Sequence, residues 1–279
     1  MLPKSNRHLQ KKGKQVTAEE KSKVYNFLKT ASSWSYGYPS PTFKEEPAFE
    51  DDIEIPEEHE EIKAQEQVQV QPQISQIPAE QNSAEKVPSQ GATLESIAAK
   101  IALCKNCVLC KARTNTVPGE GVKNPYVMVI GEGPGEDEDK TGRPFVGKAG
   151  QLMNMAFQGL GIKRQEVYIT NIVKCRPPAN RVPEQDEAET CLNYLRNQVI
   201  LVKPKVIVLL GSTALKNVLG KEYSITASRG KWIEQKGIMY MPTWHPAALL
   251  RDENKKIEFW KDLKVVVKFF NKSGVEDEK

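Results

Sequence analysis

The sequence predicts an α/β fold in which helices cover both faces of a parallel sheet. Three short apolar runs of strand length alternate with segments of helical periodicity, and they occupy residues 126–130, 167–171 and 205–210. Apolar strands that alternate with helices are typical of a parallel sheet that is buried on both faces. Functional side chains of such sheets lie beyond the carboxyl ends of the strands. These ends deliver four loops, at residues 131–139, 171–183, 211–212 and 244–251.

The first predicted element is a helix over residues 93–103, because apolar residues from Leu94 to Ile101 recur at helical spacing. Further helices are expected between the strands and near the end of the chain, the second of them just after Pro183. Two more strands flank Lys236-Gly237 and are expected to pair as a hairpin or to follow one another, at residues 231–235 and 238–243. The further helices occupy residues 148–160, 184–202, 212–219 and 255–270.

Two domains of different character are expected. Residues 1–92 contain an acidic stretch and a Gln/Pro-rich stretch that cannot bury much apolar surface, so we expect a largely disordered, low-complexity extension. A short amphipathic helix is expected within it at 17–31, where a replication or repair protein could dock. Residues 93–279 form the folded domain.

Charge and composition narrow the class of protein. The extension carries a net charge of −4 and residues 93–279 a net charge of +8, which suits a polyanionic partner such as nucleic acid. No apolar run reaches the roughly 20 residues of a membrane-spanning helix. The basic start of the chain lacks the apolar segment of a secretory signal. We therefore expect a cytosolic, reducing compartment, in which five cysteines favour a metal over disulfides.

The cysteines are spaced as metal ligands. Cys104 and Cys107 form a C-x-x-C pair, whereas Cys175 and Cys191 are far apart. Structural zinc usually has two close pairs, so this spacing favours an iron–sulfur cluster with four thiolates, and zinc is the alternative. Cys110 extends the first pair to C-x-x-C-x-x-C, but the C-P that ends a ferredoxin run is missing.

The glycine-rich segment 131–139 follows the first strand and reads GEGPGEDED. It is not a dinucleotide site, because Glu136 stands where the third glycine is needed and the acids would repel a phosphate. We expect a tight turn that presents backbone N–H groups and carboxylates able to position water or a base. An acidic surface loop is the alternative.

Three single residues in the predicted loops have chemistry that suits a base-binding site. Phe145 could stack on a nucleobase or anchor its loop in the core. The Asn171 amide could read a pyrimidine edge or cap the end of its strand. His245 could donate a hydrogen bond to a developing anion or have a structural role.

In this order, the C-x-x-C pair, GEGPGEDED, TGRPFVGKAG, YITNIVKCRPP, RGKW and HPAALLR resemble the family 4 uracil-DNA glycosylases. The resemblance runs from Cys104 to Arg251. It implies a three-layer α/β/α sandwich on a four-stranded parallel sheet. It also implies a monofunctional hydrolase of base excision repair that removes uracil from single- or double-stranded DNA, and a cytoplasmic, nucleoid-associated monomer from a bacterium or archaeon.

The resemblance assigns the cofactor and the catalytic set. Four cysteines match the ligands of a 4Fe-4S cluster, namely Cys104, Cys107, Cys175 and Cys191, and Cys110 is outside that set. The catalytic positions are Glu132, Glu138, Asn180 and His245. Among them, Glu138 and Asn180 would place the attacking water, and His245 would bind uracil O2 and stabilise the departing uracilate.

The remaining assignments concern the base and the DNA. Gly133 would line the uracil pocket, Phe145 would stack on the flipped base and Asn171 would read its edge. The DNA contacts would be Leu249, Leu250 and Arg251, which enter the duplex, and Arg229 and Lys231, which contact phosphates. The KRRIH insert of covalently trapped relatives is replaced by Cys175-Arg176-Pro177-Pro178, so ordinary turnover is expected.

Two alternatives compete with this interpretation. A non-catalytic iron–sulfur or zinc DNA-binding module would need the cysteines but not the pocket residues. Residues 266–270 faintly resemble a sliding-clamp-binding segment, although a Leu replaces the leading Gln and the same residues suit the buried face of the last helix.

Overall fold

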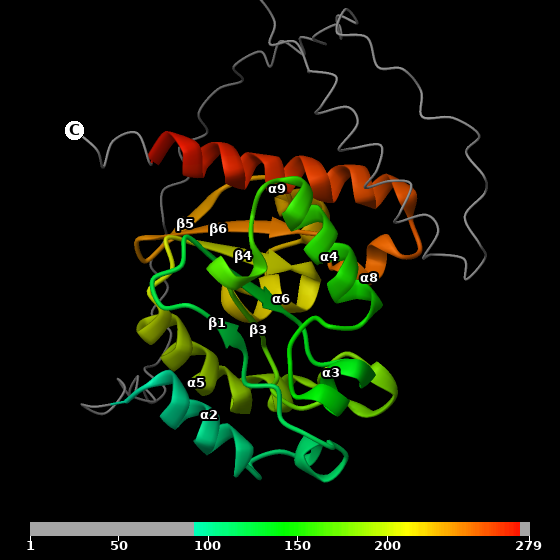
Figure 1. Ribbon diagram of the computed structural model, residues 1–279. Coiled ribbons are helices and arrows are strands. Elements are labelled where there is room, and N and C mark those ends of the chain that lie inside the picture. The colour runs from blue at the N-terminus through cyan, green and yellow to red at the C-terminus, as the bar shows by residue number, and fades with distance from the viewer. Residues whose placement is uncertain (1–91, 274–279) are drawn as a thin grey trace, which may run out of the picture.

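The computed structural model describes residues 92–273, with side chains described to residue 270. A six-stranded sheet with the order β1-β3-β2-β4-β6-β5 forms its centre. The four inner strands are parallel, and the two edge strands pair antiparallel with their neighbours (Figure 1). The strands are β1 (Glu120–Gly121), β2 (Val127–Gly131), β3 (Tyr168–Asn171), β4 (Val206–Leu210), β5 (Ile233–Gln235) and β6 (Ile238–Thr243).

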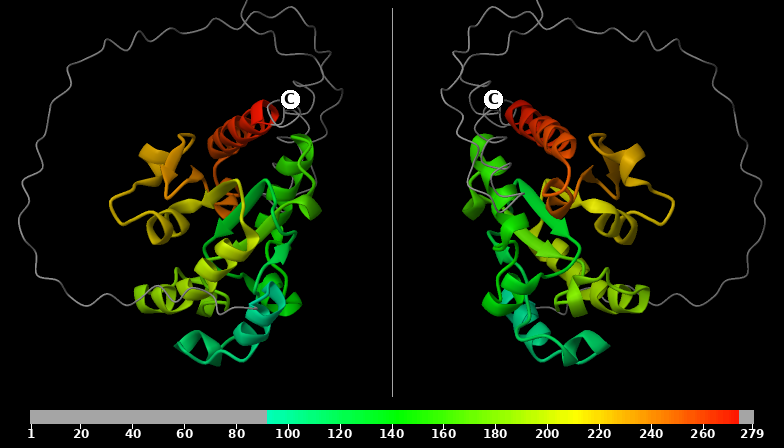
Figure 2. Two further views of the ribbon diagram at one scale, coloured as in Figure 1. Left: turned by 90° about the vertical axis from the view of Figure 1, so that its left-hand side faces the viewer. Right: turned by 90° about the vertical axis from the view of Figure 1, so that its right-hand side faces the viewer.

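Helices cover both faces of the sheet, which confirms the predicted three-layer fold. Helices α4 (Lys148–Gly159), α8 (Pro246–Leu249) and α9 (Glu253–Ser273) pack on one face, and α5 (Gln185–Val202) and α6 (Gly211–Val218) pack on the other. Helix α2 (Leu94–Ala102) lies against α5 on the outside. The side views show α2 and α9 at opposite ends of the domain (Figure 2).

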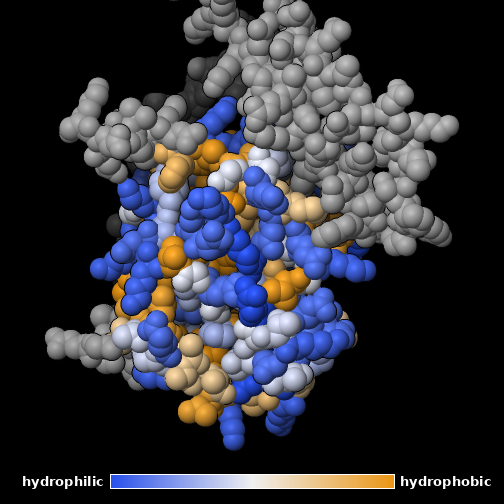
Figure 3. All heavy atoms as spheres, in the orientation of Figure 1, coloured by the Kyte–Doolittle hydropathy of each residue, from blue (hydrophilic) through white to orange (hydrophobic). Residues whose placement is uncertain are grey.

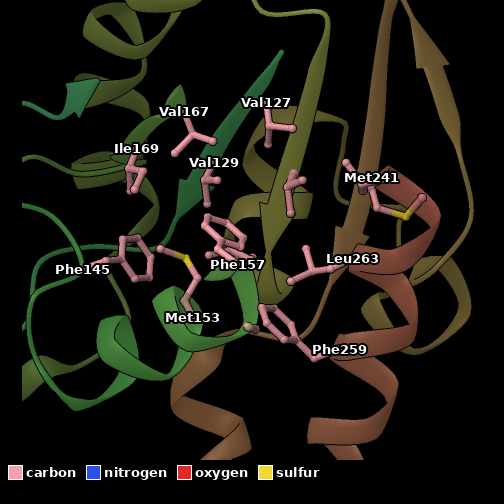
Figure 4. Packing of buried hydrophobic residues seen from close by; sticks show 14 of the residues in the cluster. Val127, Val129, Phe145, Met153, Phe157, Val167, Ile169, Met241, Phe259 and Leu263 are labelled. Atoms are coloured by element: carbon pink, nitrogen blue, oxygen red, sulfur yellow. The ribbon is translucent and has the colours of Figure 1, made fainter. Parts of the chain in front are cut away.

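Successive side chains of each strand point to opposite faces of the sheet, so the core consists of two clusters. In β2, Val127 and Val129 face α4 and α9, whereas Met128 and Ile130 face α5 and α6. Figure 4 shows the first cluster, with Phe145 at its edge beside Met153. All five residues of β2 are buried, as the apolar run predicts for a central strand.

The predicted helices and strands are found with small shifts at their ends, and residues 231–243 form the antiparallel hairpin β5–β6. The expected tight turn at 131–139 is only half right. Residues 136–141 form the short helix α3 (Glu136–Thr141), which begins after Gly135. The edge strand β1, α8 and the single turn α7 (Ile225–Ser228) were not predicted either.

The face of the described domain in Figure 3 is mostly polar, and apolar side chains appear at the lower end of the view, over α2 and the loop after it. Leu103 and Val108, on either side of the C-x-x-C pair, are exposed large apolar residues of that segment. None of the described helices has the length and apolarity needed to cross a membrane.

The N-terminal extension up to residue 91 lies outside the described residues, and so does the helix expected at 17–31.

Candidate active site

A pocket of about 580 Å³ opens at the carboxyl ends of β2 and β3, next to α8. The topology explains its position, because parallel strands present their following loops at one edge of the sheet. The pocket brings together eight of the residues singled out from the sequence, and these are Glu132, Gly133, Glu138, Phe145, Asn171, Asn180, His245 and Arg251.

Asn171 is the last residue of β3 and points into this pocket. Its side chain is almost completely buried, and its Oδ1 lacks a hydrogen-bond partner within the described part of the chain. The opposite strand allows this approach because Gly131 has no side chain. A Cβ atom at Gly131 would lie 2.5 Å from Asn171 Oδ1 and 2.5 Å from Phe145 Cζ. Leaving a buried oxygen unpaired costs on the order of 1–3 kcal/mol, which suggests that a ligand supplies the missing donor.

Phe145 forms the apolar wall of the pocket, and its loop is held in a strained conformation. Its φ is +51°, which is rare for an aromatic residue, and Gly150 packs so closely that a Cβ there would lie 2.1 Å from the Phe145 carbonyl oxygen. Arg164 donates to the carbonyl oxygens of Pro144 and Phe145 and forms an ion pair with Glu120. Phe145 therefore belongs both to the core and to the wall of the pocket. Its role as an anchor of the loop is confirmed, and its stacking on a base stays a prediction.

His245 faces Phe145, with ring centroids 5.9 Å apart, and is the N-cap of α8. Its Nδ1 accepts from the Ala247 N–H at 3.2 Å, so in the neutral ring the proton is on Nε2. Nε2 is buried and has no partner among the described residues. Burial lowers the pKa of His245 to about 4. The pocket thus contains a neutral imidazole that can donate one hydrogen bond.

The acidic segment frames the pocket through its backbone and its carboxylates. Glu138 accepts from the N–H groups of Val146 and Gly147 at 2.8 Å and from that of Gly135 at 3.0 Å. It therefore ties the start of α3 to the loop that carries Phe145. Glu132 accepts a short hydrogen bond from Thr213 on α6. Both residues line the pocket as predicted, and Glu138 is a structural tie within its wall.

The loop after β3 closes the other side of the pocket. Asn180 adopts a φ of +55° and accepts from Arg176 Nε at 2.8 Å. Arg181 is held by the buried Glu187, with a separation of 2.7 Å. Val182 follows on the rim with 60% of its surface exposed. Sequence reasoning missed Val182, because one Val between an Arg and a Pro has no periodic signal.

Two of the predicted DNA contacts are engaged inside the domain in this structure. Leu249 is fully buried in the core cluster formed with α4 and α9, so it cannot enter a duplex while the core is intact. Arg229 is engaged inside the domain, where it donates to Asp262 at 2.8 Å and lies 5.9 Å from the centre of the Trp244 ring. This internal ion pair holds the guanidinium group, and the phosphate contact of Arg229 stays a prediction.

The other predicted DNA contacts keep a suitable position. Leu250 is partly buried at the edge of the core, and Arg251 is exposed on the rim of the pocket. Lys231 is exposed just before the β5–β6 hairpin. The sequence could not separate Leu249 from Leu250, since in a four-residue helix neighbouring positions give no reliable periodicity.

The cysteines gather at a second site, between α2 and the N-terminal half of α5. All five cysteines line one small cavity, together with Arg113, Lys174 and Tyr194. Arg113 Nη1 donates to Cys175 Sγ at 3.0 Å, and its Nη2 donates to the Cys104 carbonyl oxygen at 2.8 Å. Cys110, which the resemblance leaves outside the ligand set, lines the same cavity.

The chemistry of this cavity suits a thiolate-bound metal group. Burial raises the pKa of Cys107 and of Cys175, and raises that of Cys191 to about 11. A bound cation compensates such buried thiolates, and metal binding displaces their protons. Among residues 92–273, however, no three His, Cys, Asp or Glu side chains already stand in a metal-binding arrangement. The donors surround one cavity but do not yet form a compact ligand set.

Comparison with known proteins agrees with the fold and the pocket. The family model described as the uracil DNA glycosylase superfamily matches residues 118–264. The chain therefore belongs to the uracil DNA glycosylase superfamily.

Individual relatives narrow the assignment. The chain is 46% identical to a type-4 uracil-DNA glycosylase of Sulfurisphaera tokodaii, over 62% of this chain and 83% of the relative. It is 42% identical to a type-4 enzyme of Thermotoga maritima, over 65% of this chain and 96% of the relative. A type-5 uracil-DNA glycosylase of Pyrobaculum aerophilum is 32% identical over 48% of this chain and 66% of the relative. Within the superfamily, the chain belongs to the type-4 uracil-DNA glycosylases.

Proposed function

We propose that the protein removes uracil from DNA by hydrolysing its N-glycosidic bond, as a uracil-DNA glycosylase of base excision repair. The observation that carries this proposal is the pair of unpartnered, buried polar atoms in one pocket. Asn171 Oδ1 is an acceptor and His245 Nε2 is a donor, and the Phe145 ring lies beside them. Uracil supplies the complementary N3–H donor and O2 acceptor, together with a flat face for the ring.

The reaction follows from these groups. A base inside a duplex cannot reach a buried pocket, so the nucleotide must flip out, at a cost of a few kcal/mol. Water adds to the sugar C1′ while the bond from C1′ to uracil N1 breaks, and the bonding electrons leave with the base. The proton that the attacking water loses passes through solvent to the uracil anion, so that the products are free uracil and an abasic sugar. His245 donates from Nε2, which is buried, to O2, where negative charge develops. No protein nucleophile is required.

The polar wall of the pocket would position the attacking water. We assign this role to the Glu138–Asn180 side of the pocket, where Glu138 fixes the loop and Asn180 faces the cavity.

Arg251 and Leu250 would contact the DNA at the rim of the pocket, and Lys231 would contact a phosphate group. Loss of a single phosphate contact should lower the salt dependence of binding without changing base specificity.

Release of free uracil from single-stranded and double-stranded oligonucleotides tests the proposal. We expect release from both substrates and no release from matched thymine-containing DNA. Binding of DNA without any uracil release would instead identify a non-catalytic DNA-binding module. A partner that docks on the N-terminal extension is a separate proposal, and deleting residues 1–91 should leave uracil release intact.

Gly131→Ala should strongly reduce uracil release, because the new methyl group would push against Asn171 Oδ1 and Phe145. We expect a loss of at least about tenfold in kcat/KM from displaced binding groups. Gly161→Ala is a suitable control, since a Cβ there meets nothing within 4 Å although φ is +78°. The control should cost about 1–2 kcal/mol of stability and leave the rate unchanged. Equal rates for both variants would contradict the proposed pocket.

We also propose a 4Fe-4S cluster in the cysteine cavity, with Cys104, Cys107, Cys175 and Cys191 as ligands. The family resemblance supports the cofactor, and the shared cavity supports the set of residues. The cluster would fasten α2 and the C-x-x-C loop to α5 and to the loop after β3. Its role would be structural, since the cysteines do not line the base pocket.

Cys175→Ser should therefore lower the colour, the iron content and the folding stability of the protein. Any loss of uracil release should follow from that loss of stability. A structural metal site contributes directly to folding, so we expect low solubility or a large fall in the unfolding midpoint. Cys110→Ser is the matched control and should retain iron and colour. A colourless wild-type protein with stoichiometric zinc would replace the cluster by zinc. A Cys175→Ser protein that is fully stable but inactive would contradict the structural role.

A further inference from the structure

Lys174 is a buried lysine whose ammonium group bonds to the backbone of Asn171. The side chain is 1% exposed, and its Nζ donates to three oxygens. These are Thr170 Oγ1 at 2.6 Å, the Asn171 carbonyl oxygen at 2.7 Å and Gln198 Oε1 at 2.7 Å. All three ammonium protons are thus used, and each acceptor is a neutral group. Burying an ammonium group is costly, and these three hydrogen bonds offset part of that cost.

The network around Lys174 ties three parts of the domain together. Gln198, on α5, also donates to the Pro118 carbonyl oxygen at 2.6 Å and to the Tyr168 hydroxyl at 3.2 Å. Thr170 donates to the same Pro118 oxygen at 3.0 Å. The Val117 N–H donates to the Lys174 carbonyl oxygen at 2.8 Å. The end of β3 is therefore fixed to α5 and to the segment before β1.

The bond to the Asn171 carbonyl oxygen matters most for the pocket. Asn171 is the last residue of β3, and after it the chain turns into the loop that carries Cys175. The Ile172 N–H still bonds to the Gly131 carbonyl oxygen at 2.9 Å. Lys174 holds the other side of the same peptide group. The direction of the Asn171 side chain is thus set by a peptide plane that is held at both its carbonyl and its N–H.

We propose that Lys174 is a positioning residue for uracil recognition, and that it acts by holding the Asn171 peptide so that the side-chain amide faces the base. This inference rests on the proposed function of the pocket. Lys174 also lies next to Cys175 and lines the cysteine cavity, so it connects the cysteine site to the base-reading residue. Neither the cysteine cavity nor the base pocket alone explains why Lys174 is buried.

Lys174→Met tests this inference, because Met has a similar length and cannot donate to Asn171. At equal metal content, we expect kcat for uracil release to fall on the order of 100-fold, as for a misplaced binding group. Thr170→Val is the matched control. It removes one partner of Lys174 but leaves the bond to Asn171, so it should lower stability without lowering kcat.

A double-mutant cycle with Asn171→Ala supplies a readout that a purely structural role would not change. If Lys174 acts through the Asn171 side chain, Lys174→Met should have little further effect on kcat once that side chain is absent. Independent effects that multiply would overturn the inference. If Lys174→Met does not fold, Lys174→Leu, which also has no donor for the Asn171 carbonyl oxygen, enters the same cycle. An inactive wild-type protein would refute the proposed function instead, so the two failures are distinguishable.

Discussion

Asn171→Ala is expected to reduce uracil release by at least about 100-fold while leaving the fold intact. In the proposed function the Asn171 side chain hydrogen-bonds to the edge of uracil, and the alanine variant cannot form these bonds. Because Oδ1 lacks a partner in the described structure, its removal does not break an internal bond. The free energy of unfolding should stay the same or rise by up to about 1 kcal/mol.

The measurement is steady-state release of uracil together with a urea unfolding curve for each protein. Asn193→Ala on the exposed side of α5 is the control and should match the wild type in both. A near-normal rate for Asn171→Ala with unchanged unfolding would contradict the assigned role. A large loss of stability would show instead that the amide is structural.

The sequence predicted best what depends on local pattern. The inner strands were found because they are short, continuous apolar runs, as in 206–210. The long helix at 185–202 was found because it follows Pro183, where a helix can begin. Helix α3 was missed because EDEDKT has no apolar face. It is stabilised instead by a Lys140–Glu136 ion pair and by Asp139, which accepts from the N–H of Thr114.

Side-chain roles that depend on distant partners could not be predicted. Arg229 is neutralised by Asp262, which is 33 residues away in sequence and adjacent only in the fold. The sequence likewise gives no indication that Lys174 is buried, because its partner Gln198 comes from another element. Eight of the residues singled out from the sequence line one pocket because a parallel sheet brings its loops to one edge.

His245 gives a second prediction with a large expected effect. His245→Gln should lower uracil release by on the order of 100-fold, because the donor toward O2 is displaced as negative charge develops there.

A neutral His245 should also determine how the rate of uracil release by the wild type depends on pH. With the pKa of His245 at about 4, the rate of the wild type should not fall as pH decreases through 6.5, where an ordinary histidine would titrate.

Burial of His245 should make the free energy of unfolding fall as the pH decreases. A histidine in a salt bridge would have the opposite effect. The imidazole is neutral in the folded protein down to about pH 4, whereas in the unfolded chain it gains a proton below about pH 6.5. The unfolded state therefore binds more protons in this window, and the free energy of unfolding falls as pH decreases from about 6.5 to about 4. A shift of this size corresponds to a loss on the order of 3 kcal/mol, and none of it should be felt above pH 7.

Urea unfolding of the wild type and of His245→Gln at a series of pH values isolates this contribution. The other two histidines of the chain are present in both proteins, so their effects cancel in the difference. The variant should become more stable relative to the wild type as the pH falls below about 6. Parallel curves for the two proteins would mean that His245 is protonated as readily in the folded state as in the unfolded chain, and a charged imidazole would then have to replace the neutral donor in the proposed mechanism.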